Sequence, residues 1–362
     1  MRRGAVMNRN ETPYSNLKIF RHMDILNQIE KGERCNPLYI RIKPTNVCNH
    51  NCYYCHYKNS YLSLDEYNPK DFIPHDKMME IVEDMAKMGV KAVTFSGGGE
   101  PLVYPFIEET MKKILDKGID LSIITNGSML TGRKAEILAR AKWVRISIDS
   151  IHPENYAKIR GISQDAMGIL QRNIREFAKI KNSDCELGIN FVIGKENYKE
   201  ITDVAVTMKE LGVNHVKFAP LINNETEKYH EDIKNDVIHI LNKISEELDS
   251  DNFKVIDLYT SDFGNYEVFK RNYSRCPIKE FICVIGANCK VYYCHDKAYL
   301  SNGCVCNLKY QSFLKGWRGA EITDLFQKFD AKEICKQHCV YDSRNILINS
   351  YLDMNKNHVN FV

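Results

Sequence analysis

The sequence predicts an α/β protein in which an open (β/α)6 barrel is followed by a small cysteine-rich α+β domain. Between residue 37 and about residue 222, apolar β-rich runs alternate with amphipathic helical stretches. This alternation is typical of parallel strands joined by helices. Eight of the thirteen cysteines lie between 276 and 339. Clustered thiolates are typical metal ligands, so this segment is expected to form a separate domain.

The strands and helices of the barrel follow from apolar periodicity. Strands are expected at 38–44, 91–96, 120–125, 143–149, 185–193 and 213–219. Helices are expected near 75–88, 105–117, 131–140, 164–181 and 197–211, and a further helical pattern covers 227–249. The predicted units are an N-terminal extension (1–36), the barrel (37–225), a linker helix (226–254), the cysteine-rich domain (255–342) and a polar C-terminal tail (343–362) without clear periodicity.

Composition excludes several classes of protein. Hydrophobic residues make up 44% of the chain and charged residues 27%, which is ordinary for a globular protein. The net charge of +3 is too small to indicate nucleic acid or an anionic membrane as the main partner. The chain has no secretory signal and no apolar stretch approaching the length of a membrane span. A cytoplasmic protein is expected.

Strand alternation predicts a polar and basic barrel lumen. Successive side chains point to opposite faces of a strand, so the apolar set Leu38, Ile40 and Ile42 faces the helices. The residues expected to face inward are Tyr39, Arg41, Lys43, Thr94, Ser96, Arg145, Ser147, Asp149, Glu186, Gly188, Asn190 and Lys217. A closed eight-stranded barrel fills its lumen with branched apolar residues, whereas this lumen suits a wider, open barrel that holds a polar ligand. Its excess of Arg and Lys predicts a small, anionic substrate.

The first cysteine group follows the first strand directly. Cys48, Cys52 and Cys55 place three thiolates within eight residues. Three thiolates can hold one [4Fe–4S] cluster and leave its fourth iron without a protein ligand, whereas four would close the site. The alternative is a zinc site completed by His50 or His56.

The spacing C-x3-C-x2-C after the first strand resembles the radical S-adenosylmethionine superfamily, whose barrel is a partial TIM barrel. The resemblance implies that the open iron binds the amino and carboxylate groups of S-adenosylmethionine. One-electron reduction then cleaves this cofactor to methionine and a 5′-deoxyadenosyl radical, which abstracts a substrate hydrogen. Tyr54, before the last cysteine of the motif, is implied to lie against the adenine.

Further motifs of this family follow in strand order. After the second strand comes Ser96-Gly-Gly-Gly-Glu-Pro101, which resembles the segment that binds the methionine amino group. Glycines permit close approach and positive φ. Taken one at a time, Ser147, Asp149 and Arg160 are equally typical of helix caps or surface ion pairs. The resemblance therefore depends on the order in which the motifs follow one another over 38–222. The implied cofactor-binding residues are Tyr54, Gly97, Gly98, Gly99, Glu100, Thr125, Asn126, Ser147, Asp149, Arg160 and Asn190.

The second cysteine group resembles the C-terminal SPASM and twitch extensions of radical enzymes, which carry auxiliary iron–sulfur clusters. The resemblance implies one auxiliary [4Fe–4S] cluster held by Cys276, Cys294, Cys335 and Cys339, because no cysteine follows Cys339. Other ligand sets stay open, for example with Cys283 in place of Cys276. Cys289, Cys304 and Cys306 are further alternatives, and a structural zinc site is the simplest competing reading.

An auxiliary cluster can accept an electron from a substrate radical. We therefore expect two-electron oxidation of a small polar substrate, carbohydrate-like or nucleotide-like, with flavodoxin or ferredoxin as the external electron donor. One alternative is a redox-neutral epimerisation or rearrangement, in which Cys283, Cys304 or Cys306 returns a hydrogen. Peptide maturation is another, although the 36 residues before the first strand are too few for a leader-binding domain. The non-enzyme alternative is an electron-transfer or zinc-binding scaffold.

Cys185 lies apart from both cysteine groups and invites a role as a hydrogen-atom donor. Strand alternation places it on the same face as Leu187, Ile189 and Phe191, which is directed toward the helices. A free cysteine packs well as a small hydrophobe. Cys185 is therefore expected to belong to the core.

Overall fold

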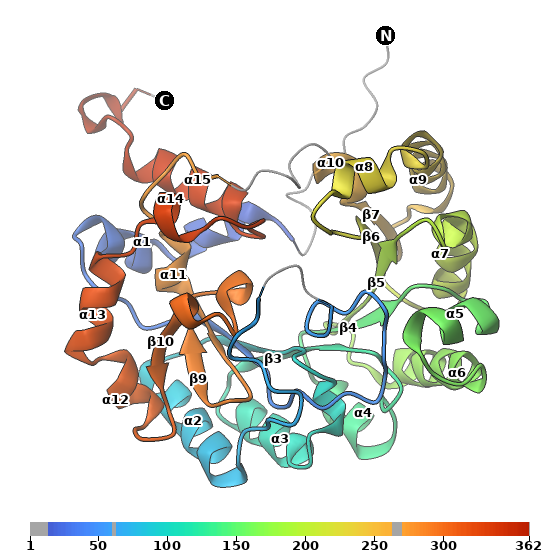
Figure 1. Ribbon diagram of the computed structural model, residues 1–362, viewed down its shortest axis with the longest axis horizontal. Helices are drawn as coiled ribbons and strands as arrows, with labels where there is room; N and C mark the ends of the chain where they lie inside the picture. The colour runs from blue at the N-terminus through green and yellow to red at the C-terminus, as the bar shows by residue number, and fades with distance from the viewer. Residues whose placement is uncertain (1–13, 60–62, 263–269, 362) are drawn as a thin grey trace.

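A computed structural model describes residues 14–59, 63–262 and 270–361, in which ten strands form one sheet in the order β10-β9-β8-β1-β2-β3-β4-β5-β6-β7. In Figure 1 the helices surround these strands in an open arc. The strands are β1 (Tyr39–Ile42), β2 (Ala92–Phe95), β3 (Asp120–Thr125), β4 (Trp143–Ile148), β5 (Glu186–Ile193), β6 (His215–Pro220), β7 (Lys254–Asp257), β8 (Ile282–Ile285), β9 (Lys290–Tyr292) and β10 (Cys304–Asn307).

The six expected strands are present as β1 to β6, and each is parallel to the next. Two more strands extend the parallel sheet. β7 pairs with β6, and β8 pairs with β1 on the opposite edge. β9 and β10 then add antiparallel pairs beyond β8. One sheet therefore runs through the expected barrel and into the cysteine-rich segment, while the domain boundaries themselves stay a prediction.

Helices follow the strands of the parallel sheet and cover its outer face. The longer helices and their shorter neighbours are α1 (Met23–Glu30), α2 (His75–Met88), α3 (Ile107–Asp116), α4 (Gly132–Leu138), α5 (Pro153–Arg160), α6 (Asp165–Ile180), α7 (Ile201–Glu210), α8 (Thr226–His230), α9 (Lys234–Leu248), α10 (Tyr259–Asp262), α11 (Ile278–Phe281), α12 (Phe313–Trp317), α13 (Ala320–Gln327), α14 (Ala331–Ile334) and α15 (Asp342–Leu352). α2 starts after Pro74 and ends at Met88, and the next residue, Gly89, caps the helix with a left-handed φ of 77°.

The main hydrophobic core lies between the sheet and these helices. Ile40 and Ile42 of β1, and Val216 and Phe218 of β6, are fully buried in it. Their neighbours Arg41 and Lys217 therefore lie on the lumen face, as the alternation predicts. The polar lumen is a direct consequence of this strand register.

The two ends of the described chain pack together. Ile19 and Leu26 share a second hydrophobic cluster with Ile348 of α15 and with Tyr341. The C-terminal residues were expected to form a tail, but 342–352 form a helix. Two of the three buried residues of α15 are asparagines, so its buried face leaves no apolar periodicity in the sequence.

No helix within the described ranges 14–59, 63–262 and 270–361 is long and apolar enough to cross a membrane.

Candidate active site

The first cysteine group lies on the loop that leaves the C-terminal end of β1. Cys48, Cys52 and Cys55 are free and partly exposed, and burial raises the pKa of Cys48 to about 11. The C-terminal end of α5 holds this loop, since the backbone N–H of Asn51 donates to the carbonyl of Arg160 at 2.8 Å. The Arg160 guanidinium also contacts the Cys52 sulfur, with Nη1 at 3.7 Å. This cation favours the thiolate, which is the metal-binding form.

Arg160, Asp149 and Tyr54 form one buried group beside the cysteine loop. The Arg160 and Asp149 side chains are 5% and 1% exposed and form an ion pair. The Tyr54 hydroxyl donates to the same carboxylate. Removing either partner of such a pair leaves an uncompensated buried charge. Three residues from three motifs therefore meet at one point.

The glycine run packs its backbone directly against the cysteine loop. A Cβ on Gly98 would lie 1.8 Å from Asn46 Oδ1, and a Cβ on Gly99 would lie 2.0 Å from the Val47 carbonyl oxygen. The Gly99 N–H donates to the Thr45 carbonyl at 3.0 Å. The close approach seen here is to the cysteine loop, while the approach to a ligand stays a prediction. The expectation of positive φ is wrong, because none of the three glycines has a positive φ. Glycine is required here for space.

Glu100 joins this loop to the turn after β3. One oxygen of its carboxylate accepts from the Thr125 hydroxyl at 2.6 Å, and the other accepts from the Asn126 N–H at 2.7 Å. The Asn126 side chain in turn donates to Asn49 of the cysteine loop at 2.8 Å. Hydrogen bonds therefore join the loops after β1, β2 and β3 into one unit. Glu100 helps to fix the positions of these loops relative to one another.

Several buried polar atoms at this site lack a hydrogen-bond partner among the described residues. They are Ser96 Oγ, Asp149 Oδ1 and Arg160 Nε. An unsatisfied buried polar atom is costly and calls for an explanation such as a missing ligand. A polar cofactor with hydroxyl, amino and carboxylate groups fits this set of donors and acceptors. S-adenosylmethionine has these groups.

Ser147 and Asn190 lie next to one another in the sheet, and Lys217 continues the same row. The register pairs Ser147 with Asn190 and Asn190 with Lys217. All three are partly exposed on the lumen face. The row places the predicted cofactor contacts of β4 and β5 beside a lysine of β6.

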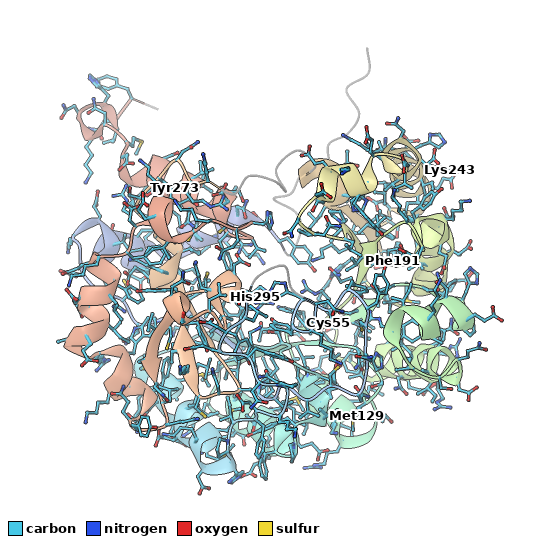
Figure 2. The ribbon with its side chains drawn as sticks, in the orientation of Figure 1. Cys55, Met129, Phe191, Lys243, Tyr273 and His295 are labelled. Atoms are coloured by element: carbon cyan, nitrogen blue, oxygen red, sulfur yellow. The ribbon has the colours of Figure 1, made fainter. Side chains whose placement is uncertain are left out.

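Several basic side chains lie together in the lumen. Burial, and then the charges of Arg41, Lys43, His56 and Arg145, lowers the pKa of His295 well below its usual value. These groups therefore share one region, and Figure 2 places His295 and Cys55 toward the middle of the arc of helices. The Nε atoms of Arg41 and Arg145 are buried without a hydrogen-bond partner among the described residues. The predicted basic lumen is present, and it suits an anionic group.

The structure gathers the four cysteines of the predicted auxiliary site. Burial, then the charge of Asp296 and those of Cys339, Cys276 and Cys335, raises the pKa of Cys294 well above its usual value. Cys276, Cys294 and Cys339 also pack against the same hydrophobic cluster. The ammonium of Lys297 is near these thiols and favours their negative form. Mutually close thiols with a neighbouring cation suit an anionic iron–sulfur cluster.

The alternative ligands lie elsewhere. Cys283 is fully buried in the main core, and the cysteine that acts on its pKa is Cys306. Cys289 has a φ of 60°, the left-handed conformation that glycine adopts more readily. Across the described residues, no three Cys, His, Asp or Glu side chains are close enough to hold a single metal ion. In a four-iron cluster each thiolate binds a different iron, so the thiolates need not be close enough to bind one ion. The observation therefore bears on sites for one metal ion, such as zinc, and does not test a four-iron cluster.

Sequence reasoning missed a hydrogen-bonded group on β5 and β6. His215 is 4% exposed, and its Nδ1 lies 3.0 Å from a Glu186 carboxylate oxygen. Its Nε2 lies 3.0 Å from the Tyr14 hydroxyl. Gly188 makes room for the ring, because a Cβ there would lie 2.2 Å from Nε2. Strand alternation places His215 on the same lumen face as Lys217, so this part could have been predicted. Nothing in the sequence indicates the contact between His215 and Tyr14.

Cys185 belongs to the core, as expected. It is 1% exposed, its sulfur lies 3.8 Å from the Leu138 carbonyl oxygen, and burial raises its pKa to about 11. Cys185→Ala is therefore expected to lower the free energy of unfolding by about 1 kcal/mol, as for other small core truncations. Cofactor cleavage by the reduced protein should stay at the wild-type rate. A loss of cleavage without a loss of stability would contradict the core assignment.

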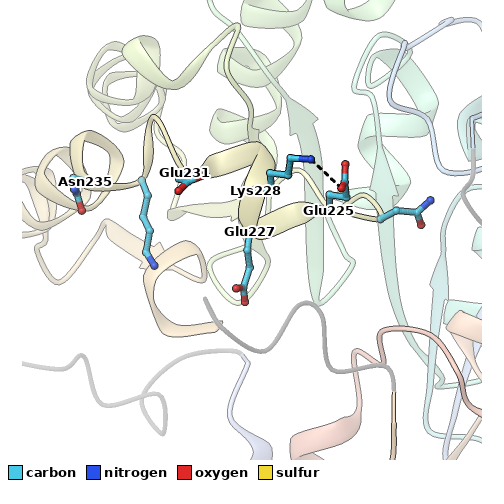
Figure 3. A pocket seen from close by; sticks show the side chains of 7 residues that line it. Glu225, Glu227, Lys228, Glu231 and Asn235 are labelled. Atoms are coloured by element: carbon cyan, nitrogen blue, oxygen red, sulfur yellow. Dashed lines mark hydrogen bonds and ion pairs between the residues drawn. The ribbon is translucent and has the colours of Figure 1, made fainter.

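Figure 3 shows a surface pocket of about 550 Å³ on α8 and α9. It contains the exposed ion pair between Lys228 and Glu225, with Nζ and Oε1 3.2 Å apart. The pocket is lined by Asn224, Glu225, Glu227, Lys228, Glu231, Lys234 and Asn235. None of these belongs to the groups described above, so the pocket is separate from the candidate active site.

Comparison with known proteins agrees with the geometry. Residues 42–237 match the model of the radical SAM superfamily. A probable GTP 3',8-cyclase of Methanocaldococcus jannaschii is 31% identical over 215 residues, which cover 58% of this chain and 67% of that protein. An S-adenosylmethionine-dependent nucleotide dehydratase of Lacinutrix mariniflava is 33% identical over 156 residues, which cover 42% of this chain and only 32% of the dehydratase.

A crystal structure of Streptococcus suis SuiB bound to S-adenosylmethionine shares the fold with a TM-score of 0.62 and 17% identity. The alignment covers 89% of this chain and 77% of SuiB. The shared fold therefore extends beyond the barrel and through most of the cysteine-rich segment.

Proposed function

The chain belongs to the radical SAM superfamily, and we propose that it oxidises a small, polar, anionic substrate by two electrons with the help of an auxiliary cluster. It is an enzyme of a family that uses S-adenosylmethionine and a [4Fe–4S] cluster. The observation that carries the proposal is the gathering of Cys276, Cys294, Cys335 and Cys339 next to Asp296, whose pKa also responds to Arg41 and Lys43 of the lumen. A second redox centre beside the substrate space suits oxidation.

The residues of the first site have distinct roles in this proposal. Cys48, Cys52 and Cys55 hold the first cluster, and Arg160 stabilises the Cys52 thiolate by direct contact. Asp149 presents a free carboxylate oxygen to the cofactor while its other oxygen is bound by Tyr54 and Arg160. When bound, the cluster and S-adenosylmethionine together supply a radical that removes one hydrogen atom from the substrate.

The basic lumen supports an anionic substrate. Arg41 and Arg145 carry buried, unpartnered Nε atoms, and the planar guanidinium group suits phosphate or carboxylate. Two relatives act on nucleotides according to their names, the GTP cyclase and the nucleotide dehydratase. A nucleotide or a sugar phosphate is therefore the favoured class of substrate.

The auxiliary site accounts for the second electron. A cluster held by Cys276, Cys294, Cys335 and Cys339 would supply an acceptor for the electron that remains on the substrate after hydrogen abstraction. We place the enzyme in the cytoplasm, where thiols stay reduced, with flavodoxin or ferredoxin as the external donor. The alternatives are a redox-neutral reaction and the modification of a peptide.

The test is an anaerobic assay of the reconstituted, reduced protein with S-adenosylmethionine and a panel of nucleotides and sugar phosphates in deuterated water. Oxidation is expected to give 5′-deoxyadenosine together with a product lighter by two hydrogens. A product of unchanged composition that carries solvent deuterium on carbon would instead show a redox-neutral reaction. If no nucleotide or sugar phosphate is changed while a peptide is, the proposed substrate class is wrong.

Replacing Cys335 with alanine tests the auxiliary ligands. The variant is expected to lose the second cluster, so that iron and sulfide fall from about eight to about four of each per chain. Cofactor cleavage by the first cluster should remain. Cys306→Ala is the matched control, because Cys306 lies with Cys283 and apart from the four ligands. Zinc in the wild-type protein, or iron loss in Cys306→Ala, would contradict this ligand set.

A further inference from the structure

The cysteine-rich segment reaches back to the glycine loop through one tyrosine. Tyr299 is fully buried, and its hydroxyl donates to Asn46 Oδ1 at 2.5 Å and accepts from the Ala287 N–H at 3.1 Å. Its φ of 64° is a conformation that few residues other than glycine adopt. Surrounding contacts must therefore hold Tyr299 in place, and strained residues of this kind concentrate at functional sites.

Asn46 transmits this contact to the glycine loop. Its side chain is buried, donates through Nδ2 to the Asn68 carbonyl at 2.7 Å, and lies directly against Gly98. A Cβ at Gly98 would also lie only 3.0 Å from the Tyr299 hydroxyl oxygen. Any shift of Tyr299 or Asn46 therefore changes the space beside Gly98.

Two more side chains donate hydrogen bonds to carbonyl groups of the glycine loop. The Tyr67 hydroxyl donates to the Gly98 carbonyl at 3.0 Å, and the Lys43 ammonium donates to the Gly97 carbonyl at 2.7 Å. The rings of Tyr67 and Tyr299 meet edge to face with centroids 5.3 Å apart. Tyr299 is thus the member of this group that comes from the cysteine-rich segment, while the others come from the barrel half.

We propose that Tyr299 is a positioning residue for S-adenosylmethionine, through which the cysteine-rich segment sets the shape of the loop that binds the methionine end of the cofactor. The inference rests on the family's use of this cofactor and on the assignment of Gly97–Gly99 to it. It does not depend on the proposed oxidation. Tight cofactor binding then requires that the C-terminal segment is docked on the barrel.

The test compares Tyr299→Phe with Tyr293→Phe in the reconstituted full-length protein. Tyr293 is a matched control, since it is buried in the same segment and its hydroxyl donates to the Leu325 carbonyl at 3.2 Å, away from the loop. Tyr299→Phe is expected to weaken the binding of S-adenosylmethionine about tenfold, the usual worth of one buried hydrogen bond. It should also change the electron paramagnetic resonance spectrum of the reduced first cluster with cofactor bound.

Asn46→Ala removes the other partner of the same hydrogen bond and is expected to give the same spectral change. The double variant should weaken cofactor binding by less than the sum of the two single effects, because each single variant already removes the hydrogen bond that Tyr299 and Asn46 share. Cofactor binding and spectra that match those of Tyr293→Phe in both single variants would overturn the proposal. Neither measurement uses a substrate, so failure here is distinct from failure of the proposed oxidation.

Discussion

Replacing Cys52 with alanine is expected to abolish the reductive cleavage of S-adenosylmethionine. The proposed first cluster has three protein ligands, so the loss of one would leave two thiolates for four irons. Cys52 is also the cysteine that contacts Arg160. The measurement is 5′-deoxyadenosine after anaerobic reconstitution and reduction, and the iron content should fall from about eight to about four per chain.

Cys185→Ala is the control for this experiment, because it removes a buried thiol of the barrel that touches neither site. It should retain cleavage and the full iron content. Cleavage by Cys52→Ala at the wild-type rate would refute the assignment of the cluster loop. Loss of cleavage in both variants would show that the assay reports folding rather than ligation.

Replacing Arg160 with methionine should have the largest effect on stability of any single change considered. It leaves the Asp149 carboxylate buried at 1% exposure without its cation, and breaking such a pair costs about 3–5 kcal/mol. The same change removes the cation beside Cys52 and a predicted contact with the cofactor. Urea unfolding of the protein without clusters and equilibrium binding of S-adenosylmethionine to the reconstituted protein measure the two effects.

The double variant Arg160→Met with Asp149→Asn separates charge from packing. Because it removes both charges, it should be more stable than Arg160→Met alone, while cofactor binding stays impaired. Lys179→Met is the matched surface control, since Lys179 and Glu176 form an ion pair with both side chains 61% exposed. That change should cost less than about 1 kcal/mol. Equal losses in the buried and surface variants would contradict the role given to the buried pair.

Much of the fold could be predicted because its signals are local. Apolar alternation in β1 and β6 identifies both the strands and their lumen faces. α5 was missed for a physical reason. It has eight residues, and one of its three buried residues is Arg160, whose burial depends on its ion pair with Asp149, the residue that follows β4. α15 was missed because Asn345 and Asn349 form part of its buried face through hydrogen bonds to 275–278.

The candidate site also has one part that the sequence predicts and one part that depends on contacts between distant segments. The three cysteines of the first loop are close in sequence, so their spacing alone predicts that they bind the same iron–sulfur cluster. The four cysteines of the second group are spread over 276–339, and several ligand sets were open on spacing alone. The tertiary structure favours the first set, because Cys276, Cys294 and Cys339 pack against one hydrophobic cluster and Cys335 is near enough to act on the pKa of Cys294. Cys283 is instead near Cys306.

The sequence by itself determined the superfamily, the six-stranded parallel barrel, the cluster loop and the basic lumen, because each depends on residues close along the chain or on strand periodicity. The tertiary structure decided what depends on contacts between distant segments. It paired β8 with β1, joined Glu100 to the turn after β3, and brought Tyr299 against Asn46 across more than 250 residues. Such contacts arise from packing and hydrogen bonds between complete elements, and no periodicity in the chain records them.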